Sequence, residues 1–192
     1  GSTITVDNIV FKEHQYDDGT VIPAAASAPT ISDEDNMFKA LEVVKYSTWF
    51  ADAGWGELPV QPTIDFNADG YTFTAPAGVG GDQWQAQVHM WTNVKTSAED
   101  SYDFLMTIES TADIKNVTVK IQKGDSLGDS TDDDGTYIAL DRIDVYGGEP
   151  TLYFFKGKQG IDTNNLQVCM DYAGIPEGAK VTVSDIRMAV TK

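Results

Sequence analysis

The residues with the most informative chemistry are neutral hydrogen-bonding and aromatic side chains that alternate along residues 85–91. Gln85, Gln87, His89 and Trp91 take every second position, and apolar residues fill the positions between them. Strict alternation predicts a half-buried strand, so the four side chains share one face. Amides, an imidazole and an indole suit uncharged polyols, because they hydrogen-bond hydroxyls and cover the apolar face of a sugar ring. This face is our first candidate for a binding surface.

Two further pairs of residues extend the candidate surface. Gln167 and Asp171 lie on the polar side of a second alternating segment, residues 166–171. Trp49 and Trp55 lie in a glycine-containing segment that we interpret as a loop, where large aromatic rings have little core to fill. For each of these tryptophans the sequence leaves two roles equally open, which are packing at the edge of the core and contact with a ligand.

The chain offers few residues for catalysis. It has two histidines, and His14 lies in a linker-like segment, which leaves His89 as the one credible base. The sequence has no His-Glu-x-x-His zinc motif and no Gly-x-x-x-x-Gly-Lys phosphate loop. Thirty acidic residues make a glycosidase carboxylate pair conceivable, but most of them lie in turn-like segments. The residues therefore favour binding over catalysis.

Length and charge narrow the class of protein further. The chain of 192 residues has the length of one domain and is large enough to bury a core without disulfides. Its single cysteine, Cys169, excludes an intrachain disulfide and a cysteine-rich zinc site. The net charge of -17 makes nucleic acid and anionic membranes poor partners. No apolar run approaches the roughly 20 residues that a membrane span needs, so we expect no membrane insertion.

The pattern of short alternating segments predicts the fold class. Such segments dominate from about residue 60 onward, and turns rich in Gly, Asp and Asn separate them. This spacing predicts an all-β protein, a β-sandwich or jelly roll of two antiparallel sheets. In the expected strand 84–91, Trp84 falls on the apolar face with Ala86. In residues 152–155, alternation leaves an outward orientation of Tyr153 and Phe155 open.

The N-terminal part of the chain differs from the rest. Residues 1–36 hold one predicted strand followed by a linker rich in Pro, Ala and Ser, and we place the main module at residues 37–192. The segment Ile4–Ile9 echoes the closing segment Val181–Ile186. The N-terminal strand is therefore either the end of a preceding, similar module or an edge strand of ordinary β composition.

From about Ala40 onward the chain resembles carbohydrate-binding modules of family 4 and its relatives, families 9, 16 and 22. The resemblance rests on the tryptophan-containing segment Trp49–Trp55, on Asp-Gln-Trp-Gln-Ala-Gln-Val at 82–88, on Tyr-Asp-Phe at 102–104, and on Val-Thr-Val-Ser-Asp-Ile at 181–186. It implies a jelly roll whose concave sheet forms an open cleft for a β-glycan. By position, the cleft-lining side chains would be Gln85, Gln87, His89, Trp91, Gln167 and Asp171.

The resemblance also implies a setting for the chain. It implies a non-catalytic, monomeric module that is secreted or displayed on a bacterial surface and that brings an attached glycoside hydrolase to its polysaccharide. We expect xylan or xylo-oligosaccharides as the ligand, with a β-1,3- or mixed-linkage glucan as the alternative. A structural calcium ion would use Asp185, although the Asn-Gly-Asp-Phe-Glu opening that often supplies its other ligands is missing. A rival interpretation is a protein-interaction or structural β-sandwich of a surface protein.

Overall fold

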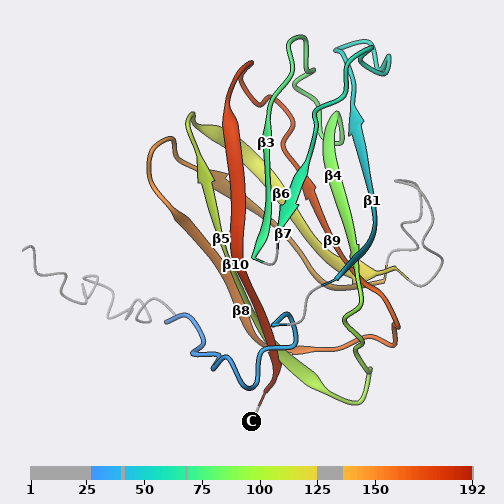
Figure 1. Cartoon of the computed structure of the whole chain (residues 1–192), viewed down its shortest axis with the longest axis vertical. Helices are drawn as coiled ribbons and strands as arrows, with labels where there is room; N and C mark the ends of the chain where they lie inside the picture. Colours follow the sequence, from blue (N-terminus) through green and yellow to red (C-terminus); the bar gives the residue numbers. More distant parts are fainter. Residues whose placement is uncertain (1–26, 40–41, 68, 125–135, 192) are drawn as a thin grey trace, which may run out of the picture.

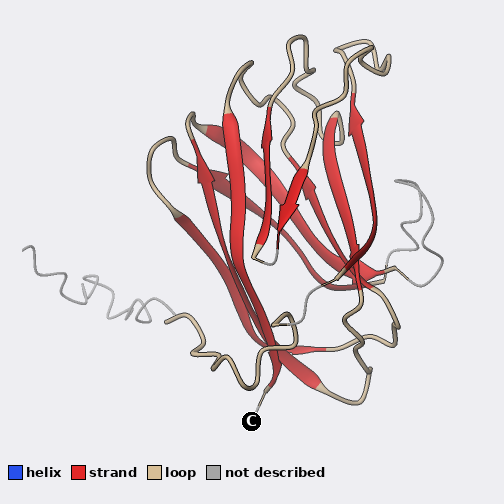
Figure 2. Cartoon of the chain, in the orientation of Figure 1, coloured by secondary structure: helices blue, strands red, loops and turns tan. Residues whose placement is uncertain are grey.

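The computed structural model describes residues 27–39, 42–67, 69–124 and 136–191. All regular secondary structure in these ranges is β-strand, and the strands form two five-stranded antiparallel sheets (Figure 1, Figure 2). The predicted β-sandwich is confirmed. Within these ranges there is no helix with the length and apolarity that crossing a membrane requires.

The two sheets each combine strands from distant parts of the sequence. The first sheet has the order β1 (Val43–Phe50), β4 (Ala86–Thr92), β9 (Leu166–Asp171), β6 (Ile114–Lys123) and β7 (Tyr137–Val145). The second sheet has the order β2 (Asp65–Asn67), β3 (Gly70–Thr74), β10 (Lys180–Val190), β5 (Ser101–Ser110) and β8 (Thr151–Gln159). A turn at residues 37–39 precedes β1, which begins at Val43.

The hydrophobic core lies between the inner faces of the two sheets. Alternate residues of each central strand point inward and are buried, among them Val88, Met90, Val119, Ile121, Val168 and Met170 of the first sheet. Burying one such side chain stabilises the fold by about 1.5–3 kcal/mol. Because the side-chain period of a strand is two, this inward set fixes which residues form the outer face of the first sheet.

Tyr153 and Phe155 face inward, so the outward orientation that the alternation left open is wrong. Each is 5% exposed, whereas Leu152, the residue before Tyr153 on β8, is 48% exposed. The register of β8 against β5 pairs Phe155 with Phe104, and the two rings stack at 5.3 Å. Alternation alone could not decide between the two faces of this strand because both carry large apolar side chains.

A hydrogen bond between two buried phenols connects the two sheets at one end of the core. The hydroxyl groups of Tyr71 on β3 and Tyr172 just after β9 lie 2.6 Å apart. Burial raises the pKa of both phenols above the ordinary tyrosine value. Both groups are therefore neutral over the physiological pH range, and each satisfies the other in a place that water does not reach.

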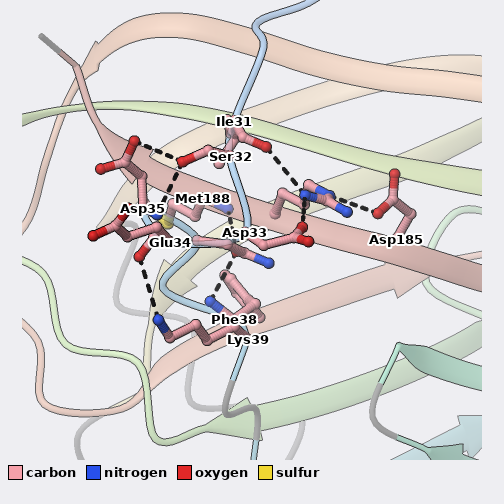
Figure 3. A network of polar contacts seen from close by, with 11 residues as sticks. Ile31, Ser32, Asp33, Glu34, Asp35, Phe38, Lys39, Asp185 and Met188 are labelled. Atoms are coloured by element: carbon pink, nitrogen blue, oxygen red, sulfur yellow. Dashed lines mark hydrogen bonds and ion pairs between the residues drawn. The ribbon is translucent and has the colours of Figure 1, made fainter.

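Residues 31–38 pack along β10, as Figure 3 shows. The guanidinium of Arg187 donates to the Asp33 carboxylate at 2.6 Å and to the Ile31 carbonyl at 3.1 Å. The Met37 N–H donates to the Met188 carbonyl at 2.8 Å. These contacts attach the segment to the outer side and edge of the second sheet.

Phe38 completes this attachment by entering the core. Its side chain is 2% exposed and meets the ring of Phe104 edge-on, with 6.2 Å between the centroids. The predicted boundary between residues 36 and 37 therefore falls inside a segment that packs on the sandwich. The N-terminal strand predicted within residues 1–36 lies outside the described residues.

Candidate functional site

The outer face of the first sheet carries three cross-strand rows of polar and aromatic residues. Directly paired residues of antiparallel strands point to the same side, with about 5 Å between their Cβ atoms. We call the 15 residues of these rows the polar face. The first row is Lys45, Trp91, Gln167, Gln122 and Tyr137; the second is Ser47, His89, Cys169, Lys120 and Leu140; the third is Trp49, Gln87, Asp171, Thr118 and Arg142.

The register brings most of the predicted binding residues together. Trp91 pairs directly with Gln167, and Gln87 pairs directly with Asp171, because β4 and β9 are neighbours. Trp49 is paired with Gln87 from the other side. His89 lies between the two pairs. Six of the eight predicted residues thus lie on the polar face, and Gln85 and Trp55 lie outside it.

Buried polar atoms without a hydrogen-bond partner among the described residues gather on this face. They include Ser47 Oγ, Trp91 Nε1, Gln122 Oε1, Gln167 Nε2 and Asp171 Oδ1. Leaving one such group unsatisfied costs about 1–3 kcal/mol, so native proteins supply a partner from water or from a ligand. The five atoms are donors, acceptors and a hydroxyl, which is the combination that sugar hydroxyls can satisfy.

Gln122 and Gln167 act as a pair in this arrangement. The side-chain amide of Gln122 donates to the side-chain carbonyl of Gln167. The pair then presents one free carbonyl and one free amide group to the polar face. Turning both amides over gives the same result, one donor and one acceptor side by side. Such a pair matches two neighbouring hydroxyls on one sugar ring.

Asp171 holds the turn that precedes β4. Its Oδ2 accepts a hydrogen bond from the Trp84 N–H at 2.9 Å and another from the side-chain amide of Gln83, which also donates to Thr118 Oγ1. Burial raises the pKa of the Asp171 carboxyl above its ordinary value, and these hydrogen bonds oppose the rise. The other oxygen, Oδ1, belongs to the unsatisfied set.

Trp84 lies on the polar side of the sheet, so its predicted place on the apolar face is wrong. Its φ of 76° interrupts the alternation before β4 begins at Ala86. The ring lies 4.6 Å from Lys120 Nζ, measured to the ring centroid. A left-handed residue at the start of a strand reverses the side on which its side chain lies, and no alternation rule anticipates it.

Trp91 does not have the accessible ring face that stacking on a sugar requires. It is fully buried, Lys45 Nζ lies 4.9 Å from its ring centroid, and its ring stacks on His89 at 5.7 Å. A Cβ at Gly124 would come within 2.6 Å of the indole, so the backbone of β6's end needs glycine there. This placement favours packing as the role of Trp91.

Exposure increases from the centre of the polar face toward its two edges. Lys45, Ser47 and Trp49 on β1 are half-buried, and Arg142 on β7 is exposed. Trp49 is therefore the tryptophan of the three rows with accessible surface. It lies at the end of β1 and not in a loop, because the strand continues to Phe50.

Trp55 and Gln85 lie beyond the third row. Trp55 is 48% exposed at the tip of a turn in which the Asp52 carboxylate accepts hydrogen bonds from two backbone N–H groups. Gln85 is fully buried, and both ends of its amide are used: Nε2 donates to the Asp52 carbonyl, and Oε1 accepts from the Asp82 N–H. Gln85 therefore joins two loops, whereas the Trp55 side chain faces solvent.

The described residues do not fit a calcium site at Asp185. This residue is exposed in an irregular part of β10, and its carboxylate already accepts a hydrogen bond from Arg187 Nε at 2.7 Å. The described ranges contain no group of three or more His, Cys, Asp or Glu residues that could hold a metal ion. Calcium needs six to eight oxygen ligands, so one engaged carboxylate is not a site.

Several members of the polar face were not singled out from the sequence. Thr118, Lys120 and Gln122 alternate with apolar residues in β6, so their position on a polar side was readable. Alternation does not show which strands lie next to one another in the sheet. The pairing of β6 with β9, and of β1 with β4, is what places these residues and Ser47 in the same rows.

A hollow of about 470 Å³ lies on the side of the sandwich where β7 and β8 form the edges. Arg142 is among its lining residues, and three other polar groups there are paired, because the Asp141 carboxylate accepts from the Tyr153 hydroxyl at 2.7 Å and from Lys158 Nζ at 3.0 Å. The polar face, with its unsatisfied atoms, is therefore the stronger candidate site.

No protein-family model and no curated protein matches this chain. Solved structures similar to it include a family 4 carbohydrate-binding module at 14% identity and a TM-score of 0.48, covering 76% of this chain and 94% of that one. The apo form of BiXyn10A CBM1 has 10% identity and a TM-score of 0.49, with 80% and 94% covered. The N-terminal cellulose-binding domain of a β-1,4-glucanase from Cellulomonas fimi has 12% identity and a TM-score of 0.48, with 87% and 99% covered.

Proposed function

We propose that this chain is a non-catalytic module that binds a β-linked glycan on the polar face of its first sheet. Xylan or a xylo-oligosaccharide is the ligand we favour, and the module would bring an attached, secreted glycoside hydrolase to it. The observation that supports the proposal is the cluster of buried, unsatisfied polar atoms on this one face. A ligand rich in hydroxyls would satisfy donors and acceptors together.

The contacts follow from the position of each group. Trp49 supplies the accessible aromatic surface against which a pyranose ring would stack. Ser47, Gln122, Gln167 and Asp171 supply the hydrogen bonds. One stacked ring and a few hydrogen bonds, less the entropy lost by a flexible sugar chain, correspond to a Kd in the micromolar to millimolar range.

The polar face also contains a cysteine and a histidine close together, which raises the question of catalysis. His89 Nε2 lies 3.6 Å from Cys169 Sγ. The two residues are 0% and 1% exposed, and reactive cysteines are typically partly exposed, whereas buried structural cysteines are inert. This burial supports a binding role over nucleophilic catalysis.

Affinity electrophoresis tests the proposal directly. The protein is run in native gels that contain xylan, laminarin, barley β-glucan, galactomannan or no polysaccharide. We expect retardation by xylan and loss of that retardation in Trp49→Ala. Tyr46→Ala is the matched control, since Tyr46 is an exposed aromatic residue of the same strand outside the rows.

The outcomes separate the candidate functions. Retardation by laminarin or barley β-glucan alone would replace xylan with a β-1,3- or mixed-linkage glucan. Retardation by no polysaccharide would favour the protein-interaction interpretation of the polar face. Release of reducing sugar from any of the polysaccharides would contradict a purely binding role.

A further inference from the structure

The charge of the polar face differs in sign from that of the whole chain. The chain has 30 acidic and 13 basic residues. The polar face holds three of the basic residues, Lys45, Lys120 and Arg142, and one of the acidic residues, Asp171. A face that had to bind only neutral sugars would gain nothing from this reversal of charge.

Two of the three cations come from the neighbouring strands β6 and β7. Arg142 on β7 pairs with Thr118 on β6, and Lys120 is two residues further along β6. From the strand spacing and the rise per residue, their Cα atoms are roughly 8 Å apart. Arg142 is exposed, and none of the ion pairs among the described residues involves it. Its planar guanidinium is suited to bidentate recognition of a carboxylate.

The groups around Arg142 fit a glycan chain that carries this carboxylate. The unsatisfied carbonyl of Gln122 faces the same side on the adjacent strand, roughly 14 Å further along it at the usual rise per residue, where it would accept from a hydroxyl of another sugar of the same chain. Asp171 is two strands away from Arg142 in the third row, which is about 10 Å at the usual strand spacing. A carboxylate at Arg142 is thus closer to the cations than to the one acid of the face.

We infer that the polar face recognises a glycan that bears a hexuronate carboxylate, with Arg142 contacting the carboxylate and Lys120 adding positive charge beside it. This inference rests on the proposed function. The negative charge elsewhere on the chain does not prevent such binding, because at physiological ionic strength charges more than about 8 Å away are largely screened. The local cations then decide the interaction.

The test compares matched ligands by titration calorimetry. The ligands are a xylo-oligosaccharide, the same oligosaccharide with one glucuronate branch, and an oligogalacturonate whose carboxylates lie in the backbone. We expect the branched ligand to bind about tenfold more tightly than the neutral one, because one hydrogen bond between charged groups contributes roughly this much to affinity. Arg142→Gln should remove this difference, so that the branched and the neutral ligand bind with equal affinity. High salt should also reduce the difference in affinity between the branched and the neutral ligand.

The control variant is Lys156→Gln, which removes one positive charge from an exposed position of β8 in the other sheet and should preserve the tenfold difference. If the oligogalacturonate binds and Arg142→Gln abolishes that binding, the result would support the carboxylate site. It would also show that the recognised carboxylate lies in the backbone of the glycan. Equal affinity for the neutral and branched ligands would overturn the inference and leave the proposed glycan binding intact. Binding of none of the three would overturn both.

Discussion

The Lys45 ammonium lies 4.9 Å from the ring centroid of Trp91, over a tryptophan that no solvent reaches. A cation at this distance from an indole face is attracted by the ring, and it occupies the space that a stacked sugar would need. Trp49, which lies on β1 beside the strand of Trp91, has accessible surface. Two tryptophans of the same face therefore have different roles.

Substitution of these two tryptophans should separate stability from binding. Trp91→Ala leaves a large cavity and should lower the free energy of unfolding by about 3–5 kcal/mol, measured by urea denaturation. Trp49→Ala should change stability far less and weaken glycan binding by about 2 kcal/mol, measured by calorimetry. A Trp49→Ala variant that binds as tightly as the original chain would remove Trp49 from the site.

The pH dependence of stability should report the burial of Asp171. Its pKa is raised on folding, so the folded chain holds the proton more tightly than the unfolded chain does. The stability that this carboxyl contributes is then present at acid pH and is lost as pH rises through its folded pKa. In Asp171→Asn this loss is absent. Urea denaturation at several pH values should show the variant gaining stability relative to the original chain as pH rises; a constant difference would contradict the burial.

The phenol pair between the sheets predicts a non-additive stability effect. Tyr71→Phe leaves the buried Tyr172 hydroxyl without its 2.6 Å partner and should cost about 1–3 kcal/mol in the free energy of unfolding. Adding Tyr172→Phe removes the unsatisfied group. Thermal and urea unfolding of the double variant should then show less destabilisation than the sum of the two single variants.

The attachment of residues 31–38 should depend on packing more than on charge. Phe38→Ala removes a ring that is 2% exposed and should lower the free energy of unfolding by about 3 kcal/mol. Arg187→Gln breaks an ion pair whose Asp33 side chain is 90% exposed, so its effect should stay below about 1 kcal/mol. If the two variants unfold at the same denaturant concentration, the segment is not held by the core.

The sequence predicted the fold class and six members of the polar face because both depend on local alternation. Gln87, His89 and Trp91 alternate with core residues, and any sandwich would place them together. The roles within the face depend on contacts that alternation does not encode. The burial of Trp91 follows from Lys45 and Gly124, which are distant in the sequence, and the loop contacts of Gln85 follow from a turn at residues 52–56.

The orientation of Trp84 and of Tyr153 shows where a period of two fails. Trp84 has a positive φ and lies two residues before β4 begins at Ala86, so the alternation of the strand does not extend to it. Tyr153 and its neighbours are large and apolar on both sides, so the pattern has no contrast. In both places the outcome is decided by partners in other strands.

The strand order of the first sheet also has a kinetic consequence. β9, near the end of the chain, inserts between β4 and β6, so the three rows are interrupted until residues 166–171 have been synthesised. Strand pairings between distant segments close slowly, typically in milliseconds to seconds. A nascent chain that lacks β9 exposes the unpaired edges of β4 and β6 side by side, and such edges are templates for association with other chains. The sheet that we assign to ligand binding is thus completed late, and the edges of β4 and β6 need protection during synthesis.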